Sequence, residues 1–151
     1  MSESSTDKTK RKVIAAMETY QPAYQTTFVF DEDMEPEYTL EAFTKIRKKV
    51  LGQFPQITLI WWIRVYRFNG QTVPMFQLFS TDKLDKVKLN NAIERTKIKI
   101  ELHYNQRSWT EDNRVRWCST IRKHKLHNLP AVYGKEKIRR FAINNKSASR
   151  Q

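Results

Sequence analysis

Residues 57–80, ITLIWWIRVYRFNGQTVPMFQLFS, form the stretch that decides the fold. Two runs rich in β-branched and aromatic residues flank Asn69-Gly70, and this dipeptide is the strongest short-range signal for a two-residue hairpin turn. Such a turn fixes the register, so Arg64 should face Met75 across the two strands. The stretch therefore predicts a long antiparallel hairpin.

The two faces of this hairpin differ in character, because successive side chains along a strand point to opposite sides. One face is apolar throughout and carries Ile57, Leu59, Trp61, Ile63, Val65, Phe76 and Leu78. We expect helices to cover it and to bury Trp61 and Phe76. The other face is mixed and carries Trp62, Arg64, Tyr66, Phe68, Met75, Gln77 and Phe79.

Patterns on either side of the hairpin predict further elements. The expected strands are 24–31, 97–104 and 137–143, and the expected helices are 39–52, 83–95 and 109–126. A continued helix is the competing interpretation of 97–104. The order β-α-β-β-α-β predicts an α+β, ferredoxin-like open sheet with a basic C-terminal helical extension. Right-handed crossovers would place the first two helices on one face of that sheet.

Three regions follow from this layout: a basic N-terminal arm (1–20), a ferredoxin-like domain (21–106) and a basic helical extension and tail (107–151). A short helix from Val13 to Met17 is expected in the arm. The mixed face of the sheet has two interpretations. It is either an open surface of aromatic and basic groups, or a second core covered by the extension. Partial cover would reconcile the two.

The charge of the chain is +12 and is distributed unevenly. Residues 21–56 have a net charge of −2, residues 57–106 of +4 and residues 107–151 of +9. Such a concentration of positive charge attracts polyanions, so DNA or RNA is the expected partner, with a solubilising surface as the plain alternative. No apolar run approaches membrane-spanning length, no signal peptide is evident, and the single Cys118 suits a reducing compartment. We expect a cytoplasmic protein without membrane contact.

The candidate binding residues lie on the mixed face of the hairpin and along the late helix. They are Trp62, Arg64, Tyr66, Arg114, Arg116, Arg122 and Lys123. Basic groups would contact phosphates, and the aromatic rings would stack on bases, as in proteins that bind single strands.

Motifs for catalysis and cofactors are sparse. The chain has three glycines, no phosphate-binding loop and no Cys-x-x-Cys pair, so no cofactor or metal is expected. His124 and His127 are spaced to share a helix face, but without a third ligand they indicate a solvated basic surface. Cys118, next to Trp117, should be packed rather than reactive.

The hairpin strand VPMFQLF and the late segment KEKIRRFAINN, in this order of elements, resemble the catalytic domain of rolling-circle replication initiators, the HUH endonuclease family. The resemblance implies a metal held by a His-hydrophobic-His or His-hydrophobic-Gln triplet, and a nucleophilic tyrosine on a later helix. Here the triplet is Met75-Phe76-Gln77, and a thioether is a poor ligand for Mg²⁺ or Mn²⁺. The helix sequence WTEDNRVRWCSTIRKHK contains no tyrosine.

The sequence therefore favours a nucleic-acid-binding protein without catalytic activity, plausible for a phage, plasmid or other mobile element and resembling a degenerate replication initiator. One alternative is an enzyme, a metal-dependent DNA nickase that uses Gln77, His103 and either Tyr104 or Tyr133. Another is a protein that binds and inhibits a nucleic-acid machine.

Overall fold

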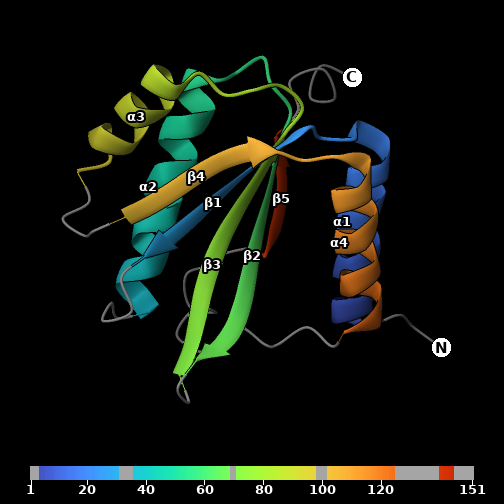
Figure 1. Ribbon diagram of the computed structural model, residues 1–151. Helices are drawn as coiled ribbons and strands as arrows, with labels where there is room; N and C mark the ends of the chain where they lie inside the picture. The colour runs from blue at the N-terminus through green and yellow to red at the C-terminus, as the bar shows by residue number, and fades with distance from the viewer. Residues whose placement is uncertain (1–3, 31–35, 69–70, 98–101, 125–139, 145–151) are drawn as a thin grey trace.

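The computed structural model describes residues 4–30, 36–68, 71–97, 102–124 and 140–144 (Figure 1). Its elements, in chain order, are α1 (Ser5–Tyr20), β1 (Tyr24–Phe30), α2 (Pro36–Gln53), β2 (Leu59–Phe68), β3 (Gln71–Ser80), α3 (Lys86–Arg95), β4 (Leu102–Ser108), α4 (Glu111–Lys123) and β5 (Phe141–Asn144). None of the helices in these ranges is both long and apolar enough to cross a membrane.

The strands form one open antiparallel sheet in the order β4-β1-β3-β2-β5, so the fold is mixed α+β. The β2–β3 hairpin has the predicted register, and Arg64 is paired with Met75. Most of the other boundaries lie within a few residues of their predicted positions, and the strand expected at 137–143 is the edge strand β5.

The first face of the sheet is covered by α2 and α3, as predicted (Figure 1). Trp61 and Phe76 are buried there with exposed fractions of 1% and 0%. Phe43 of α2 stacks on Phe76 with ring centroids 4.0 Å apart. Helical spacing on α2 brings Phe43, Ile46 and Val50 onto the sheet, so the apolar face of the hairpin forms the main core.

The second face is partly covered by α1 and α4, which lie side by side over the β2 side of the sheet (Figure 1). Val13 and Met17 of α1 pack with Trp62 and Ile121 in a second hydrophobic cluster. The basic arm expected at residues 1–20 thus contains a longer helix than the expected one from Val13 to Met17. A 16-residue helix begins after the N-cap Ser4, and its apolar stripe is buried against the sheet.

The segment after α3 departs from the predicted pattern. Helix α3 ends at Arg95. Lys97 has a left-handed backbone conformation, with φ of 54°, so the helix does not continue through this residue. Residues 98–101 lie outside the described residues, and β4 extends to Ser108, beyond the strand predicted over 97–104. This extension places additional polar side chains on the second face.

Candidate functional site

The side chains of the second face lie in rows across the strands, because paired residues on neighbouring antiparallel strands point to the same side of the sheet. From β4 inwards, two rows are Arg107–Gln25–Phe79 and Asn105–Thr27–Gln77; on the same side of the sheet, His103 pairs with Val29 and Met75 pairs with Arg64. Phe79 and Gln77 of β3 are buried beneath α4, whereas Arg64 of β2 and the members on β4 are exposed. The part of the second face that no helix covers is thus polar, and it lies beside the hydrophobic cluster under α1 and α4.

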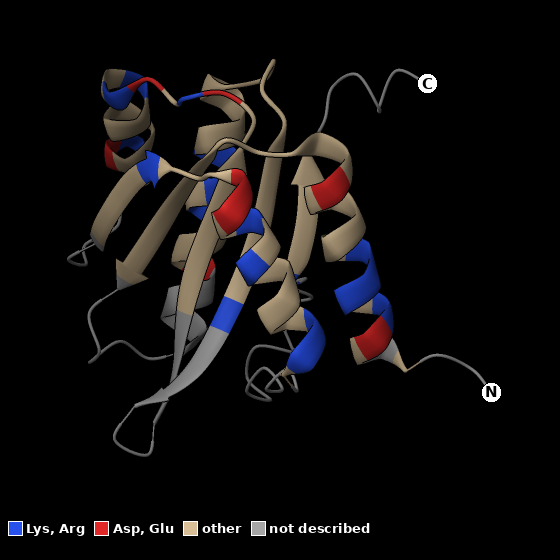
Figure 2. Cartoon of the chain, turned by 45° about the vertical axis from the view of Figure 1, so that its right-hand side comes forward, with Lys and Arg blue, Asp and Glu red and all other residues tan. Residues whose placement is uncertain are grey.

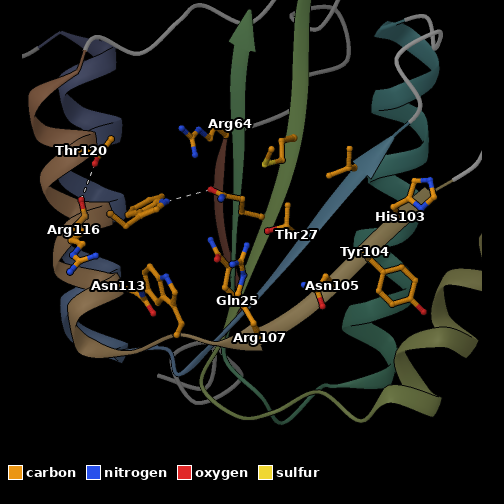
Figure 3. A pocket seen from close by; sticks show the side chains of 15 residues that line it. Gln25, Thr27, Arg64, His103, Tyr104, Asn105, Arg107, Asn113, Arg116 and Thr120 are labelled. Carbon is orange, nitrogen blue, oxygen red and sulfur yellow. Dashed lines mark hydrogen bonds between the residues drawn. The ribbon is translucent and has the colours of Figure 1, made fainter. Parts of the chain in front are cut away.

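A groove of about 700 Å³ lies on this polar part of the face, between α4 and the exposed side of β4 (Figure 3). Side chains of β1, β2, β3 and β4 form its floor. Its wall is the start and inner face of α4 and consists of Trp109, Asn113, Arg116, Trp117 and Thr120. A spacing of three and four residues puts the four helical members on one side of α4.

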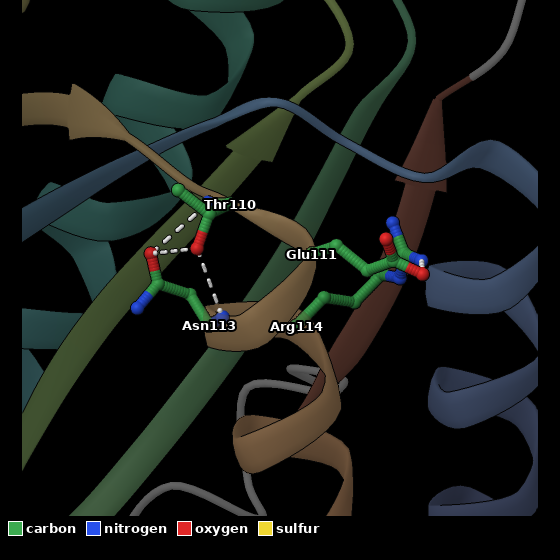
Figure 4. Close-up of polar contacts among 4 residues, drawn as sticks. All are labelled: Thr110, Glu111, Asn113 and Arg114. Atoms are coloured by element: carbon green, nitrogen blue, oxygen red, sulfur yellow. Dashed lines mark hydrogen bonds and ion pairs between the residues drawn. The ribbon is translucent and has the colours of Figure 1, made fainter.

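The position of α4 is fixed at its first turn by a reciprocal cap (Figure 4). The backbone N–H of Asn113 donates to Oγ1 of Thr110 at 3.2 Å, and the backbone N–H of Thr110 donates to Oδ1 of Asn113 at 3.0 Å. Two N–H groups that the helix leaves without partners are thereby satisfied. The cap sets which side chains of α4 face the groove, and Asn113 is itself one of them.

The groove is positively charged. Arg64 of β2, Arg107 of β4 and Arg116 of α4 line it (Figure 3), and all three side chains are exposed. Figure 2 shows in blue the Lys and Arg positions on α4 and on the strand beside it. None of the described residues that line it is an aspartate or a glutamate. Guanidinium groups that converge from three elements onto a concave surface focus positive potential there. The groove therefore suits an anionic ligand.

The aromatic side chains have a different role from the one predicted. Trp62 has an exposed fraction of 2% and meets Trp117 edge to face, with ring centroids 5.6 Å apart. The prediction that Trp62 stacks on bases is therefore wrong, because packing under α1 and α4 takes the ring out of contact with any ligand. Trp117 is half-buried, lines the groove, and donates its indole N–H to Oε1 of Gln77 at 3.4 Å.

The remaining predicted residues are divided between the groove and other surfaces. Arg64 and Arg116 line the groove, whereas Arg114 pairs with Glu111 at 3.7 Å and extends towards α1 (Figure 4). Arg122 pairs with Glu18 of α1 at 2.8 Å and so joins the two helices. The exposed side chain of Lys123 lies at the end of α4. Tyr66 is in β2, and its side chain lies outside the described part of the structure.

Arg107 and Asn105 are among the groove residues that sequence reasoning missed. Both follow the predicted end of the strand at Tyr104, yet they continue the same alternation of side chains after His103. Extending the period of two by four residues would have found them. Gln25 of β1, which is 8% exposed, was also missed because a single glutamine in an apolar strand carries no distinctive signal.

Of the residues of the nickase alternative, Gln77, His103 and Tyr104 all contribute to the lining of the groove. The ring of Tyr104 also packs on Phe28 in the main core, with ring centroids 6.0 Å apart. Burial raises the pKa of Tyr104, and Glu94 adds to the effect. Tyr133 and His127 lie outside the described residues. Within the described ranges, no cluster of three or more His, Cys, Asp or Glu side chains could hold a metal ion.

Comparison with known proteins gives no further information: no family model, no curated protein and no solved structure matches this chain.

Proposed function

We propose that this protein binds single-stranded DNA or RNA in the groove between α4 and the sheet, by contacts to phosphates and without catalysing a reaction. The observation that carries the proposal is the convergence of Arg64, Arg107 and Arg116 on a groove whose described lining has no acidic group. Arginine forks bind phosphate oxygens in pairs, and release of the counterions of the nucleic acid favours the complex.

The size of the groove supports an unpaired strand. Its volume of about 700 Å³ lies in the range of small-ligand sites, roughly 300–1,000 Å³, which accommodates one or two nucleotides and not a duplex. Amide and hydroxyl groups, including Asn105 and Thr27, lie between the arginines. They can donate to or accept from sugars and bases of a strand that is not paired.

The arrangement of elements supports a relationship at the level of the fold. Strands β1 to β4 lie in the order β4-β1-β3-β2, with α2 and α3 on one face, which is the order expected of a ferredoxin-like domain. On this proposal, α1, α4 and β5 are additions to that domain, and the basic extension begins with α4. The layout also suits a degenerate relative of rolling-circle initiators from a phage, plasmid or other mobile element, acting in the cytoplasm.

The test is a comparison of fluorescence anisotropy for single- and double-stranded DNA and RNA at two salt concentrations. Replacing Arg64, Arg107 and Arg116 together with alanine should weaken binding at low salt. It should also lower the slope of log affinity against log salt by about 2 to 2.7, because each phosphate contact on a single strand or duplex contributes roughly 0.7–0.9.

A matched control removes the same charge from elsewhere. Lys48 and Lys49 of α2 and Lys88 of α3 are exposed on elements that cover the opposite face. Their triple alanine variant should retain most of the slope. Equal losses in the two variants, or no binding by the unaltered protein at low salt, would show that the groove is not the binding site.

The nickase alternative has a direct test in the same samples. Labelled single strands incubated with Mg²⁺ or Mn²⁺ should remain intact, because Met75 offers no ligand suited to these cations and α4 contains no tyrosine. A covalent protein–DNA adduct that disappears in Tyr104→Phe or Tyr133→Phe would replace the binding proposal with the enzymatic one.

A further inference from the structure

Gln77 is the most deeply placed polar side chain on the floor of the groove. It lies on β3, in the interior of the sheet, with an exposed fraction of 4%. Its carboxamide has both a donor and an acceptor, and burying either without a partner is unfavourable. A glutamine at this position therefore needs an explanation beyond solubility.

The hydrogen bond from Trp117 determines how this carboxamide is presented. An indole N–H is a donor only, so it holds Oε1 of Gln77 towards α4 at 3.4 Å. The Nε2 group is then the part of the amide left to donate. Within the described part of the chain, no residue accepts a hydrogen bond from it. This hydrogen bond is one of those drawn as dashed lines in Figure 3.

The arginines of the groove are also hydrogen-bond donors. Arg107 is on β4, in the row next to that of Gln77, and Arg116 directly precedes Trp117 on α4. Guanidinium groups donate and do not accept. Guanine is the base that presents two neighbouring acceptors, N7 and O6, on one edge, whereas adenine presents a donor beside N7 and cytosine presents a donor.

We propose that the groove recognises an unpaired guanine, with Nε2 of Gln77 and one of the arginines that line the groove donating to O6 and N7 of the base. This inference rests on the proposed function and adds base selectivity to it. Trp117 is a positioning residue in this scheme, since it acts on the base through the amide of Gln77.

The experiment uses the full chain and four thymine-rich oligonucleotides that differ at one central position, which is guanine, adenine, cytosine or thymine. The guanine strand should bind about tenfold more tightly than the others, a typical discrimination for such a pair of contacts. A fifth strand with 7-deazaguanine lacks the N7 acceptor and should lose most of that preference.

Two variants locate the preference in the protein. Gln77→Met removes the donor at similar length, and it should reduce the guanine preference to about twofold or less while the salt slope is unchanged. Trp117→Phe frees the amide to turn and should reduce the preference in the same way. Gln56→Met, at an exposed glutamine before β2, is the matched control and should keep the preference.

The possible outcomes distinguish guanine recognition from the proposed binding of nucleic acid through its phosphates. Equal affinity for all four strands with a steep salt dependence, or full affinity for the 7-deazaguanine strand, overturns guanine recognition and leaves phosphate binding standing. Absence of binding to every strand at low salt removes both. If Gln77→Met unfolds the protein, a preference retained in Trp117→Phe overturns the assignment.

Discussion

Cys118 shows how the second cluster alters the chemistry of a single residue. Its side chain is 3% exposed among the apolar groups between α4 and the sheet. Burial raises the pKa of the thiol and is the largest effect. The charges of Arg122 and Arg114 lower this pKa by smaller amounts, and the charge of Glu18 raises it. The thiolate is the reactive form, so the native protein should react slowly with thiol reagents.

We predict that a chromogenic disulfide reagent modifies Cys118 at least tenfold more slowly in native protein than in denaturant. The raised pKa also has a consequence for stability, because the folded state holds the thiol proton more tightly than the unfolded state does. The contribution of the protonated thiol to the free energy of unfolding is fully present below the pKa of the unfolded state, about 8.5. This contribution is lost as the pH rises above that value. Urea titrations at pH 7.5 and 9.5 should show a smaller loss in Cys118→Ala.

A thiol that reacts at the same rate in native and denatured protein would mean that α4 does not stay packed on the sheet. Since the chain has one cysteine, one modified site accounts for the whole signal.

At the scale of the elements, α1 is tied to the rest of the molecule by more than apolar packing. Lys10 donates to the backbone carbonyl of His124 at 2.7 Å, and Glu18 pairs with Arg122 at 2.8 Å. Both contacts are exposed and stabilise the fold only slightly, but they align α1 with α4. The buried Val13 and Met17 supply most of the stabilising contact area.

Deleting residues 1–20 should therefore uncover the apolar side chains beneath α1. We predict a lower melting temperature and increased fluorescence of a dye that binds exposed hydrophobic surface, because Ile60 and Trp62 lose their cover. A Lys8→Ala, Lys12→Ala control changes charge and leaves the helix in place. Unchanged melting and dye binding in the deletion variant would show that α1 does not stay packed on the sheet.

The hairpin elements could be predicted from sequence because their signals are local. Asn69-Gly70 defines a turn, and the alternation of residues 57–68 assigns each side chain to a face. The covering of the second face could not be predicted in this way. Trp62 and Arg64 have the same periodicity, and only the packing of a distant helix buries the first and leaves the second exposed. Half of the candidate site depends on that distinction.

At the scale of the whole molecule, the sheet has one helix-covered face and one that is divided. The part of the second face that α1 and α4 cover lies towards β2 and β5 (Figure 1). The groove lies beside it and extends to β1 and β4. A single sheet thus separates a stabilising cluster from a polar surface. Arg64, Arg107 and Arg116 line this groove, and its concave shape focuses their field.

The outer edge of β2 is completed by β5, and we predict that a chain ending at residue 124 is prone to aggregation. The pairs Leu59–Asn144, Ile60–Ile143, Trp61–Ala142 and Trp62–Phe141 close this edge. Without them, an apolar strand edge is free to pair with another molecule. Light scattering at rising protein concentration should increase for the shortened chain and stay low for the full one.

The position of β5 also has a consequence for synthesis on the ribosome. β5 begins at residue 141 and β2 ends at residue 68, so 73 positions separate the two partners. At roughly 5–20 residues per second, translation takes about 4–15 s to cross that distance, whereas a hairpin forms within about 1–10 μs. The nascent chain must therefore carry a finished hairpin with an open, tryptophan-rich border for seconds, which makes this interval the natural point for a chaperone to act.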